Sequence, residues 1–409
     1  MKIVFVIFLF VLIAFASSAQ IDYLVSGVVK GTDGKVLPGA SVFISGTKMA
    51  SASDNNGAFH FKLTPGTYDL IVKLIGFENK STKIVVEDKS VTVNLNMEEQ
   101  TINLLEVKIS ADPNRSQYLK KFFDLFIGKS SNARYCKILN PEVLYFFYDK
   151  KNKALKASNA DFLIIENRAL GYRLKYLLES FVFDEGLTQM SYRGSVYFED
   201  LTGTEKEHME WFKNRASAYK GSPQHFFSAL YHNNLEREGF EIANIANKLN
   251  SARPADQYIK AKIKKLMIDQ QDADGLLAID KKDSLSYWLK VKSSPMYLPG
   301  LVRREIAEDT LVHKTGNRLK EIKSRNLIYV IYSKDKEESG FVSTLTDAKK
   351  ILNVNSAQLS QIKILSDSCL FSDRGNLFDP QSVYYAGYWG WKNVADSLPA
   401  DYSLSEGNR

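Results

Sequence analysis

The amino-acid sequence predicts a multi-domain protein in which an all-β sandwich precedes a larger α+β region. Short runs of alternating apolar and polar residues, separated by turn residues, fill residues 26–97. Helical spacing of apolar residues first occurs in residues 114–128. The length of 409 residues exceeds that of one ordinary domain. With 44% apolar and 25% charged residues, the chain has enough apolar material for more than one core.

The first residues follow the pattern of a cleavable export signal. Lys2 precedes an apolar run over residues 3–15, and the small residues Ser17 and Ala19 follow it. This order predicts a signal peptide over residues 1–19. The run is shorter than the roughly 18–20 residues that span a bilayer, which disfavours a membrane anchor. We therefore expect an exported protein of the periplasm or the outer-membrane surface, without a transmembrane span in the mature chain.

The sandwich is expected to occupy residues 20–97. Its predicted strands are Leu24–Val29, Ser41–Ser45, Ala58–Lys62, Gly66–Leu74, Ser81–Val86 and Ser90–Asn96. The segments between them are rich in Gly, Pro, Asn and Asp, which adopt or stabilise the backbone angles of tight turns. Alternation over residues 91–95 places three apolar side chains on one sheet face. Such short strands and regular turns are typical of an antiparallel sandwich.

The order of the turn motifs resembles the carboxypeptidase-regulatory-like domain, a transthyretin-like module. The matching motifs are Leu37-Pro38-Gly39-Ala40, Asp54-Asn55-Asn56-Gly57, Pro65-Gly66-Thr67-Tyr68 and Leu74-Ile75-Gly76-Phe77. This module is common at the front of exported envelope proteins of the Bacteroidota type. The resemblance implies a β-sandwich and an envelope location, and it implies no reaction.

Residues 98–113 are expected to form a linker, residues 114–402 the α+β region and residues 403–409 a polar tail. Strands are predicted at Val143–Tyr148, Asp161–Glu166, Arg173–Asp184, Met190–Phe198, Leu285–Val291 and Leu327–Tyr332. The segments Gln361–Leu370, Leu377–Phe378 and Ser382–Tyr388 are expected to return to strands and turns. Helices are predicted at 114–128 and Glu205–Tyr219, and a third helix begins after Ser222 and ends at Gly239. This mixture of helices and strands indicates the α+β class.

Two segments of the α+β region resemble envelope proteins that carry the same front module. They are Asn167-Arg168-Ala169-Leu170-Gly171-Tyr172 and Gly387-Tyr388-Trp389-Gly390-Trp391. That group has no activity that could be carried over to this chain. The second resemblance therefore supports the envelope location and leaves the reaction open.

The sequence lacks the local motifs of the common enzyme classes. A zinc carboxypeptidase needs a His followed by Glu at the third position and a distant second His. None of the five histidines has that neighbour: His60, His208, His225, His232 and His313. A Gly-x-Ser-x-Gly elbow and a phosphate-binding glycine loop are also absent. We therefore predict no catalytic residue, no cofactor and no metal ligand.

An aromatic cluster near the end of the chain is the candidate binding surface. It comprises Tyr385, Tyr388, Trp389 and Trp391. Exposed rings of this kind stack on sugars or receive a protein surface. The alternative, which we favour, is that the rings close the core of the α+β region.

Cys136 and Cys369 are the two cysteines of the chain. In an oxidising compartment they could form one disulfide that closes a long loop. The alternative is two separate buried thiols, since free cysteine is among the most buried residue types.

The sequence favours a binding or scaffolding protein of the cell envelope, whose partner is an envelope protein or a glycan. The formal charge of +7 is spread over the chain and includes no dense block of basic residues, so a nucleic-acid partner is not expected. Two alternatives remain open. One is a hydrolase acting on peptides or glycans, and the other is an accessory component of a TonB-dependent nutrient-uptake system, suggested by the front module.

Overall fold

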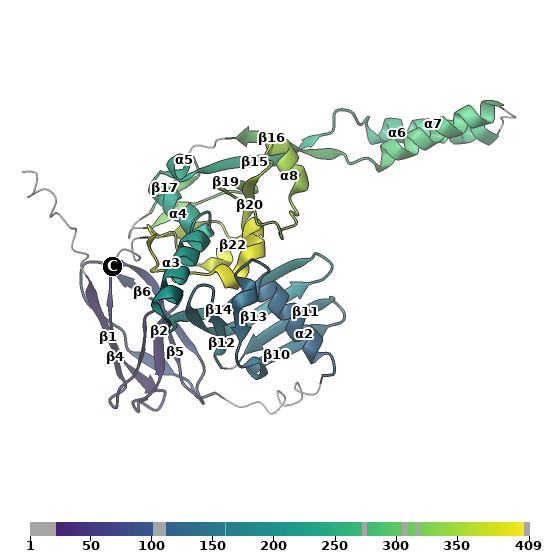
Figure 1. The fold of residues 1–409 in the computed structure, drawn as a ribbon. Coiled ribbons are helices and arrows are strands. Elements are labelled where there is room, and N and C mark those ends of the chain that lie inside the picture. Colours follow the sequence, from purple (N-terminus) through teal and green to yellow (C-terminus); the bar gives the residue numbers. More distant parts are fainter. Residues whose placement is uncertain are drawn as a thin grey trace, which may run out of the picture.

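The computed structural model describes residues 22–100, 112–159, 161–271, 276–304, 310–315 and 319–404. The predicted signal peptide, most of the predicted linker and the end of the polar tail lie outside these residues. Figure 1 shows the N-terminal strands in purple beside a second sheet in blue, and a pair of green helices that projects away from the rest. No helix among the described residues combines the length and apolar content needed to cross a bilayer.

The N-terminal strands form two facing four-stranded sheets. The strands are β1 Tyr23–Gly31, β2 Ser41–Ile44, β3 Ala50–Ala52, β4 Ala58–Leu63, β5 Gly66–Lys73, β6 Lys80–Val86, β7 Val91–Thr92 and β8 Leu95–Met97. One sheet has the order β4-β1-β7 with β8 also paired to β1, and the other has the order β3-β2-β5-β6. Buried side chains alternate along β1 and β4, as expected for strands with one face on a core. The predicted all-β sandwich is confirmed.

The second sheet has the long strand β13 at its centre. Its strands are β9 Cys136–Ile138, β10 Leu144–Asp149, β11 Ala154–Asn159, β12 Leu163–Asn167, β13 Tyr172–Asp184 and β14 Gln189–Asp200. β14 pairs with β13 along its whole length, while β12 and β11 pair with its first and last parts. Helix α2 (Arg115–Phe122) and the π-helical turn Phe123–Ile127 pack on this sheet through Phe122 and Phe126, which both contact Phe181.

The third part of the chain begins with helices and ends in an antiparallel five-stranded sheet of order β16-β15-β19-β20-β22. The helices are α3 Glu205–Tyr219, α4 Pro223–Tyr231, α5 Leu235–Glu238, α6 Asp256–Gln271, α7 Leu276–Ser293, α8 Thr346–Leu352 and α9 Tyr388–Lys392. The strands are β15 Phe240–Leu249, β16 Tyr297–Arg304, β19 Ile328–Lys336, β20 Ala357–Ile364 and β22 Val383–Gly387. A small sheet of β17 Val312–Lys314, β18 Lys320–Ile322 and β21 Cys369–Phe371 lies alongside. The predicted α+β class is confirmed.

Two predicted elements of this part are wrong. Residues 285–291 lie in helix α7 and form no strand, because a short apolar run fits a buried strand and a helix face equally well. The helix predicted from Ser222 to Gly239 is two helices, α4 and α5, with a break at Asn233, whose φ is +55°. Gly239 does end α5 in the left-handed conformation, with a φ of +87°.

The sandwich is joined to the second sheet by main-chain hydrogen bonds. The loop after β2 runs along the outer edge of β14, where Gly46 N donates to Val196 O at 2.6 Å and Phe198 N donates to Thr47 O at 2.9 Å. These two bonds extend the second sheet by one short segment of the sandwich. The contact therefore has the geometry of strand addition to a sheet edge.

Aromatic side chains fill the space beneath this contact. Phe43 of the sandwich lies 4.8 Å from Tyr197 and 5.8 Å from Phe162, measured between ring centroids. Phe43 and Tyr197 are buried together with Ile71 and Leu177 in a small cluster that draws on both bodies. Apolar burial at the junction fixes the sandwich to the α+β region, since each buried ring stabilises the contact by about 1.5–3 kcal/mol.

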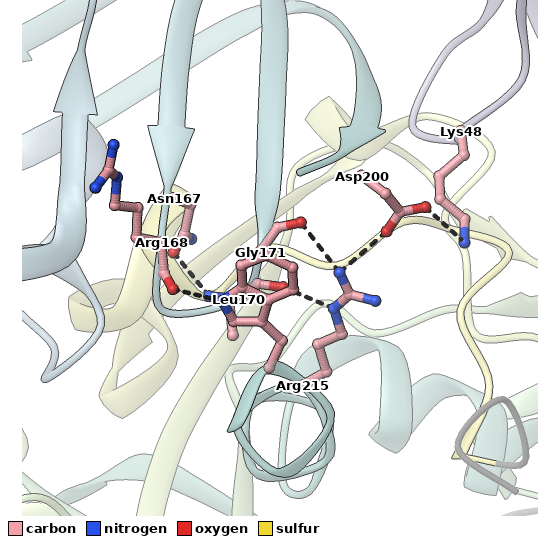
Figure 2. A network of polar contacts seen from close by, with 8 residues as sticks. Lys48, Asn167, Arg168, Leu170, Gly171, Asp200 and Arg215 are labelled. Carbon is pink, nitrogen blue, oxygen red and sulfur yellow. Dashed lines mark hydrogen bonds and ion pairs between the residues drawn. The ribbon is translucent and has the colours of Figure 1, made fainter. Parts of the chain in front are cut away.

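The turn between β12 and β13 carries the motif that begins at Asn167, and helix α3 holds it (Figure 2). Asn167 Oδ1 accepts hydrogen bonds from Ala169 N and Leu170 N, both at 3.1 Å. Trp211 of α3 donates its indole N–H to Arg168 O at 2.9 Å. The turn thus has its polar backbone groups satisfied by side chains on both sides.

Arg215 of α3 connects this turn to the sandwich. Its guanidinium donates to Leu170 O at 2.6 Å and to Gly171 O at 3.1 Å, and it pairs with Asp200 at 3.0 Å. Asp200 in turn lies 3.5 Å from Lys48 of the sandwich (Figure 2). Because Asp200 is half exposed, the two ion pairs are weak. The bonds to the two carbonyl oxygens contribute more to stability than these ion pairs do.

We expect Gly171→Ala to destabilise the fold strongly. Gly171 has a φ of +68°, and a Cβ at this position would lie 2.1 Å from the Trp211 ring. Left-handed strain and overpacking together predict a loss of about 2–4 kcal/mol in the free energy of unfolding, measured by urea denaturation. Gly76→Ala is the matched control, because Gly76 has a φ of +85° with no atom within 4 Å. Equal losses in the two variants would contradict the steric argument.

Candidate functional site

The predicted aromatic cluster lies at the start of the last helix of the chain. Tyr385 is in β22, and Tyr388, Trp389 and Trp391 are in α9. Tyr388 and Trp389 are 1% and 6% exposed, and the Trp389 indole N–H donates to Gly221 O at 2.6 Å. Trp391 is half-buried and stacks on Tyr388 with a centroid distance of 5.6 Å.

Residues 387–402, which we name the tail segment, contact the second sheet and its helix. Asn393 Nδ2 donates to Leu125 O in the π-helical turn at 2.8 Å. Asn167 Nδ2 donates to Ala395 O at 2.8 Å. Ala395 and Val394 are buried in the core of the second sheet, whereas Trp389 is buried in the core of the third part.

The same segment also reaches the sandwich. Ala400 N donates to Gly46 O at 2.6 Å, next to the loop that extends β14. Asn376 Nδ2 donates to Ala400 O at 2.8 Å. Three bodies therefore meet at the tail segment.

A stacking platform for sugar rings needs exposed ring faces, and Tyr388 and Trp389 do not offer them.

One of the five histidines is buried. His225 Nδ1 accepts a hydrogen bond from Gly221 N at 3.1 Å, and its Nε2 lies 3.2 Å from Glu238 Oε2. Burial lowers the pKa of His225, the Glu238 carboxylate opposes that effect, and Lys334 and Lys220 reinforce it. The other four histidines are exposed. Among the described residues, no three His, Cys, Asp or Glu side chains gather as a metal-binding group.

Cys136 and Cys369 are free thiols, each buried in a different core. The disulfide considered above does not form in this structure, because the core of the second sheet holds Cys136 and the core of the third part holds Cys369. Burial raises the pKa of Cys136 to about 12 and that of Cys369 to about 11. Both side chains pack as small apolar groups.

Exposed apolar side chains are concentrated in residues 249–298. Of the 22 large hydrophobic residues that are exposed in the described part of the chain, nine lie there. They are Leu249, Tyr258, Met267, Ile268, Tyr287, Leu289, Met296, Tyr297 and Leu298. Such concentrations mark interaction surfaces, whereas single exposed hydrophobics need no explanation. We therefore take this region as the candidate functional site.

Helices α6 and α7 form the projecting part of this region, which we name the arm (residues 256–293). They pack on each other as an antiparallel pair beyond the ends of β15 and β16 (Figure 1). Ile259 and Ile263 are buried in the arm, and the Tyr258 and Trp288 rings meet at 5.7 Å. The arm thus has a small apolar interior of its own.

Arg253 holds the base of the arm in place. Its guanidinium donates to Ser294 O at 2.8 Å and to Lys292 O at 3.4 Å, and it pairs with Asp256 at 2.6 Å. The Arg253 side chain is only 8% exposed. Nearby, Asn250 N donates to Met296 O at 2.8 Å, which joins the end of β15 to the start of β16 beside the helices. A buried, fully bonded arginine gives the two helices a defined direction.

A groove runs along one side of the arm, with a volume of about 390 Å³. Its lining consists of Lys260, Ile263, Lys264, Met267, Ile268 and Lys292. This site was not predicted from the sequence, because the segment was expected to contain a strand at Leu285–Val291 and no helix was predicted there. The signal that could have found it is the spacing of Lys260, Lys264 and Met267, which places these residues on one helix face.

Comparison with known proteins identifies the front of the chain. Residues 25–109 match the CarboxypepD_reg-like domain. A curated relative, TonB-dependent receptor P39 of Formosa agariphila, is 32% identical over 80 residues, which are 18% of this chain and 8% of the receptor. The chain thus spans less than a tenth of that relative's length. The resemblance stated from the turn motifs is confirmed for this domain.

Solved structures show weaker likeness. Chlorocatechol 1,2-dioxygenase from Pseudomonas putida is 14% identical with a TM-score of 0.17, covering 19% of this chain and 60% of that one. Catechol 1,2-dioxygenase from Acinetobacter is 11% identical with a TM-score of 0.19, covering 22% and 58%. The Caf1A usher C-terminal domain is 17% identical with a TM-score of 0.17, covering 19% and 99%. Identities and TM-scores this low assign no activity.

We expect Trp389→Ala to cost about 3–5 kcal/mol in the free energy of unfolding, the usual loss for a large buried aromatic. The indole packs in the core of the third part and donates a hydrogen bond to Gly221 O, so the substitution removes apolar burial and a hydrogen bond together. Trp391→Ala is the control within the same helix, and its half-buried ring should cost much less. Chemical denaturation followed by circular dichroism measures both. If Trp389→Ala unfolds at the denaturant concentration of the unmodified chain, the core role of this ring is wrong.

We expect His225 to make the fold less stable in mild acid. Its folded-state pKa lies below the unfolded value, so the unfolded chain binds a proton that the folded chain excludes. The stabilisation is present above the unfolded pKa of about 6.5 and is lost as the pH falls below it. His225→Asn keeps an acceptor for Gly221 N–H and removes the titration.

The measurement is the free energy of unfolding against pH, with His232→Asn as the exposed control. Carboxylates that do not contact His225 contribute equally to all three proteins, so the difference between the variants reports His225 together with its partner Glu238. The His225→Asn curve should be flatter between about pH 5 and 7. Parallel curves for His225→Asn and the unmodified chain would contradict the assignment.

Proposed function

We propose that this chain is an exported cell-envelope protein with a binding or scaffolding role. In this proposal the sandwich is a fixed adaptor. The arm and the adjoining ends of β15 and β16 present the contact surface. The observation that carries it is the concentration of exposed apolar side chains on the arm, whose helices pack on each other, and on the adjoining ends of β15 and β16. A surface of this kind costs solubility when left uncovered, which supports a partner for it.

The comparisons support the envelope location. The CarboxypepD_reg-like domain at residues 25–109 is of a type found in envelope proteins, and the matched relative is a TonB-dependent receptor over the same region. That shared module also favours a second candidate, an accessory component of a TonB-dependent nutrient-uptake system. The two candidates differ in their partner and share the same contact surface.

Removing the arm tests the proposal. A short Gly-Ser linker replaces residues 251–294, since Asn250 N and Met296 O are already bonded at 2.8 Å and the ends lie close. The chain without the arm should keep its unfolding midpoint and lose its crosslinks to envelope components in the producing cell. Crosslinking followed by mass spectrometry of both chains measures this.

The matched control is Leu24→Ser with Val85→Ser, which removes exposed apolar side chains from the sandwich and leaves the arm intact. This control should retain the crosslinks. Unchanged crosslinking without the arm would overturn the proposal. So would turnover of a peptide or glycan by the purified chain at a rate independent of the arm.

A further inference from the structure

We infer that the groove of the arm binds the headgroup of an anionic phospholipid and so attaches the protein to a bilayer surface. This inference rests on the proposed binding function and names the chemistry of the partner. The groove combines three lysines, Lys260, Lys264 and Lys292, with an apolar floor. The lysines match the anionic headgroup of a phospholipid, and the apolar side chains match its acyl chains.

The three ammonium groups are free to meet an anion. All three lysines are exposed, and within the described part of the chain none of them is in an ion pair. Among the residues whose side chains the structure describes, the lining includes no carboxylate. A lysine ammonium is a compact point charge that binds phosphate well, and three of them around one space favour a phosphate-bearing ligand.

The floor of the groove favours an amphiphile over a free anion. Ile263 is buried between the helices, while Met267 and Ile268 are about half exposed beside it. A small hydrated anion gains nothing from these side chains. The upper part of an acyl chain would cover them, which recovers hydrophobic free energy.

Exposed tyrosines also occur on the arm and at its base, outside the groove lining. Tyr258 and Tyr287 are exposed on the arm, and Tyr297 is exposed at its base. Tyrosine rings are enriched at membrane–water boundaries, where the ring meets the acyl region and the hydroxyl meets water. The combination of basic and amphipathic side chains on one projecting element is that of an interfacial attachment.

Charge complementarity favours a lipid surface over a second copy of the chain. Helices α6 and α7 together contain eight lysines and four aspartates, a net charge of +4, within a chain of +7. In sequence the lysines at 260–265 and 290–292 lie toward the base, where the groove is. Two such grooves would repel each other, whereas an anionic bilayer attracts each basic side chain.

Vesicle binding by the full mature chain tests the inference. Phosphatidylcholine vesicles with and without phosphatidylglycerol are the probes, and co-sedimentation gives the partition coefficient. The chain should bind the phosphatidylglycerol vesicles, and Lys260→Gln/Lys264→Gln/Lys292→Gln should weaken that binding at least about tenfold.

The matched control is Lys262→Gln/Lys265→Gln/Lys290→Gln, which removes the same charge from the same two helices outside the groove lining. It should bind more tightly than the groove variant by several-fold. Equal weakening in the two triple variants would overturn the site, because general attraction would then explain the binding. Met267→Ser/Ile268→Ser should also weaken binding, since it removes part of the floor.

Three further outcomes separate the inference from its rivals. Displacement by millimolar inorganic phosphate at constant ionic strength would overturn it in favour of a small-anion site. A groove-dependent dimer seen by light scattering would overturn it in favour of a second copy. Absent vesicle binding with retained arm-dependent crosslinks in cells would overturn the inference and leave the proposed function standing.

Discussion

The tail segment is the constraint on which the arrangement of the three bodies depends. It places Trp389 in the core of the third part and Val394 and Ala395 in the core of the second sheet. Its Ala400 amide is bonded to Gly46 in the loop of the sandwich. A segment of 16 residues can make all of these contacts only when the three bodies lie within its reach, because consecutive Cα atoms are only about 3.8 Å apart. The π-helical turn of residues 123–127 is part of this arrangement, since its Leu125 carbonyl is bonded by Asn393.

A fixed sandwich has consequences for function. Its loop extends the edge of β14, and Phe43 is buried against Tyr197, so this part of its surface is already used within the chain. Edge strands and turn loops away from the junction remain for external contacts. The sandwich therefore determines where the second and third bodies stand, and the arm, which projects from the third, acquires a defined position relative to the N-terminal domain.

Much of the fold could be predicted because local rules govern it. Gly and Asx turns separate the sandwich strands, and the capping box of Thr204 and Glu207 begins α3 at Glu205, the predicted first residue. The rest depends on tertiary contacts. Nothing local distinguishes residues 285–291 from a strand, and the burial of Trp389 depends on Gly221, 168 residues away. The arm groove requires Lys292 of α7 to line the same space as Lys260 of α6, an arrangement that follows only when the hairpin is known.

Helices and sheets differ in how safely they can expose apolar side chains, and this difference explains why such side chains can be exposed on the arm. Apolar side chains on a sheet face would draw the chain into aggregation through unpaired edges. In the helices of the arm, interior backbone groups are bonded within each helix, so the exposed Met267 and Ile268 side chains offer no edge to a second strand. Lysines beside Met267 and Ile268 keep this part of the arm hydrated. In the proposed attachment, the same lysines would also select an anionic partner.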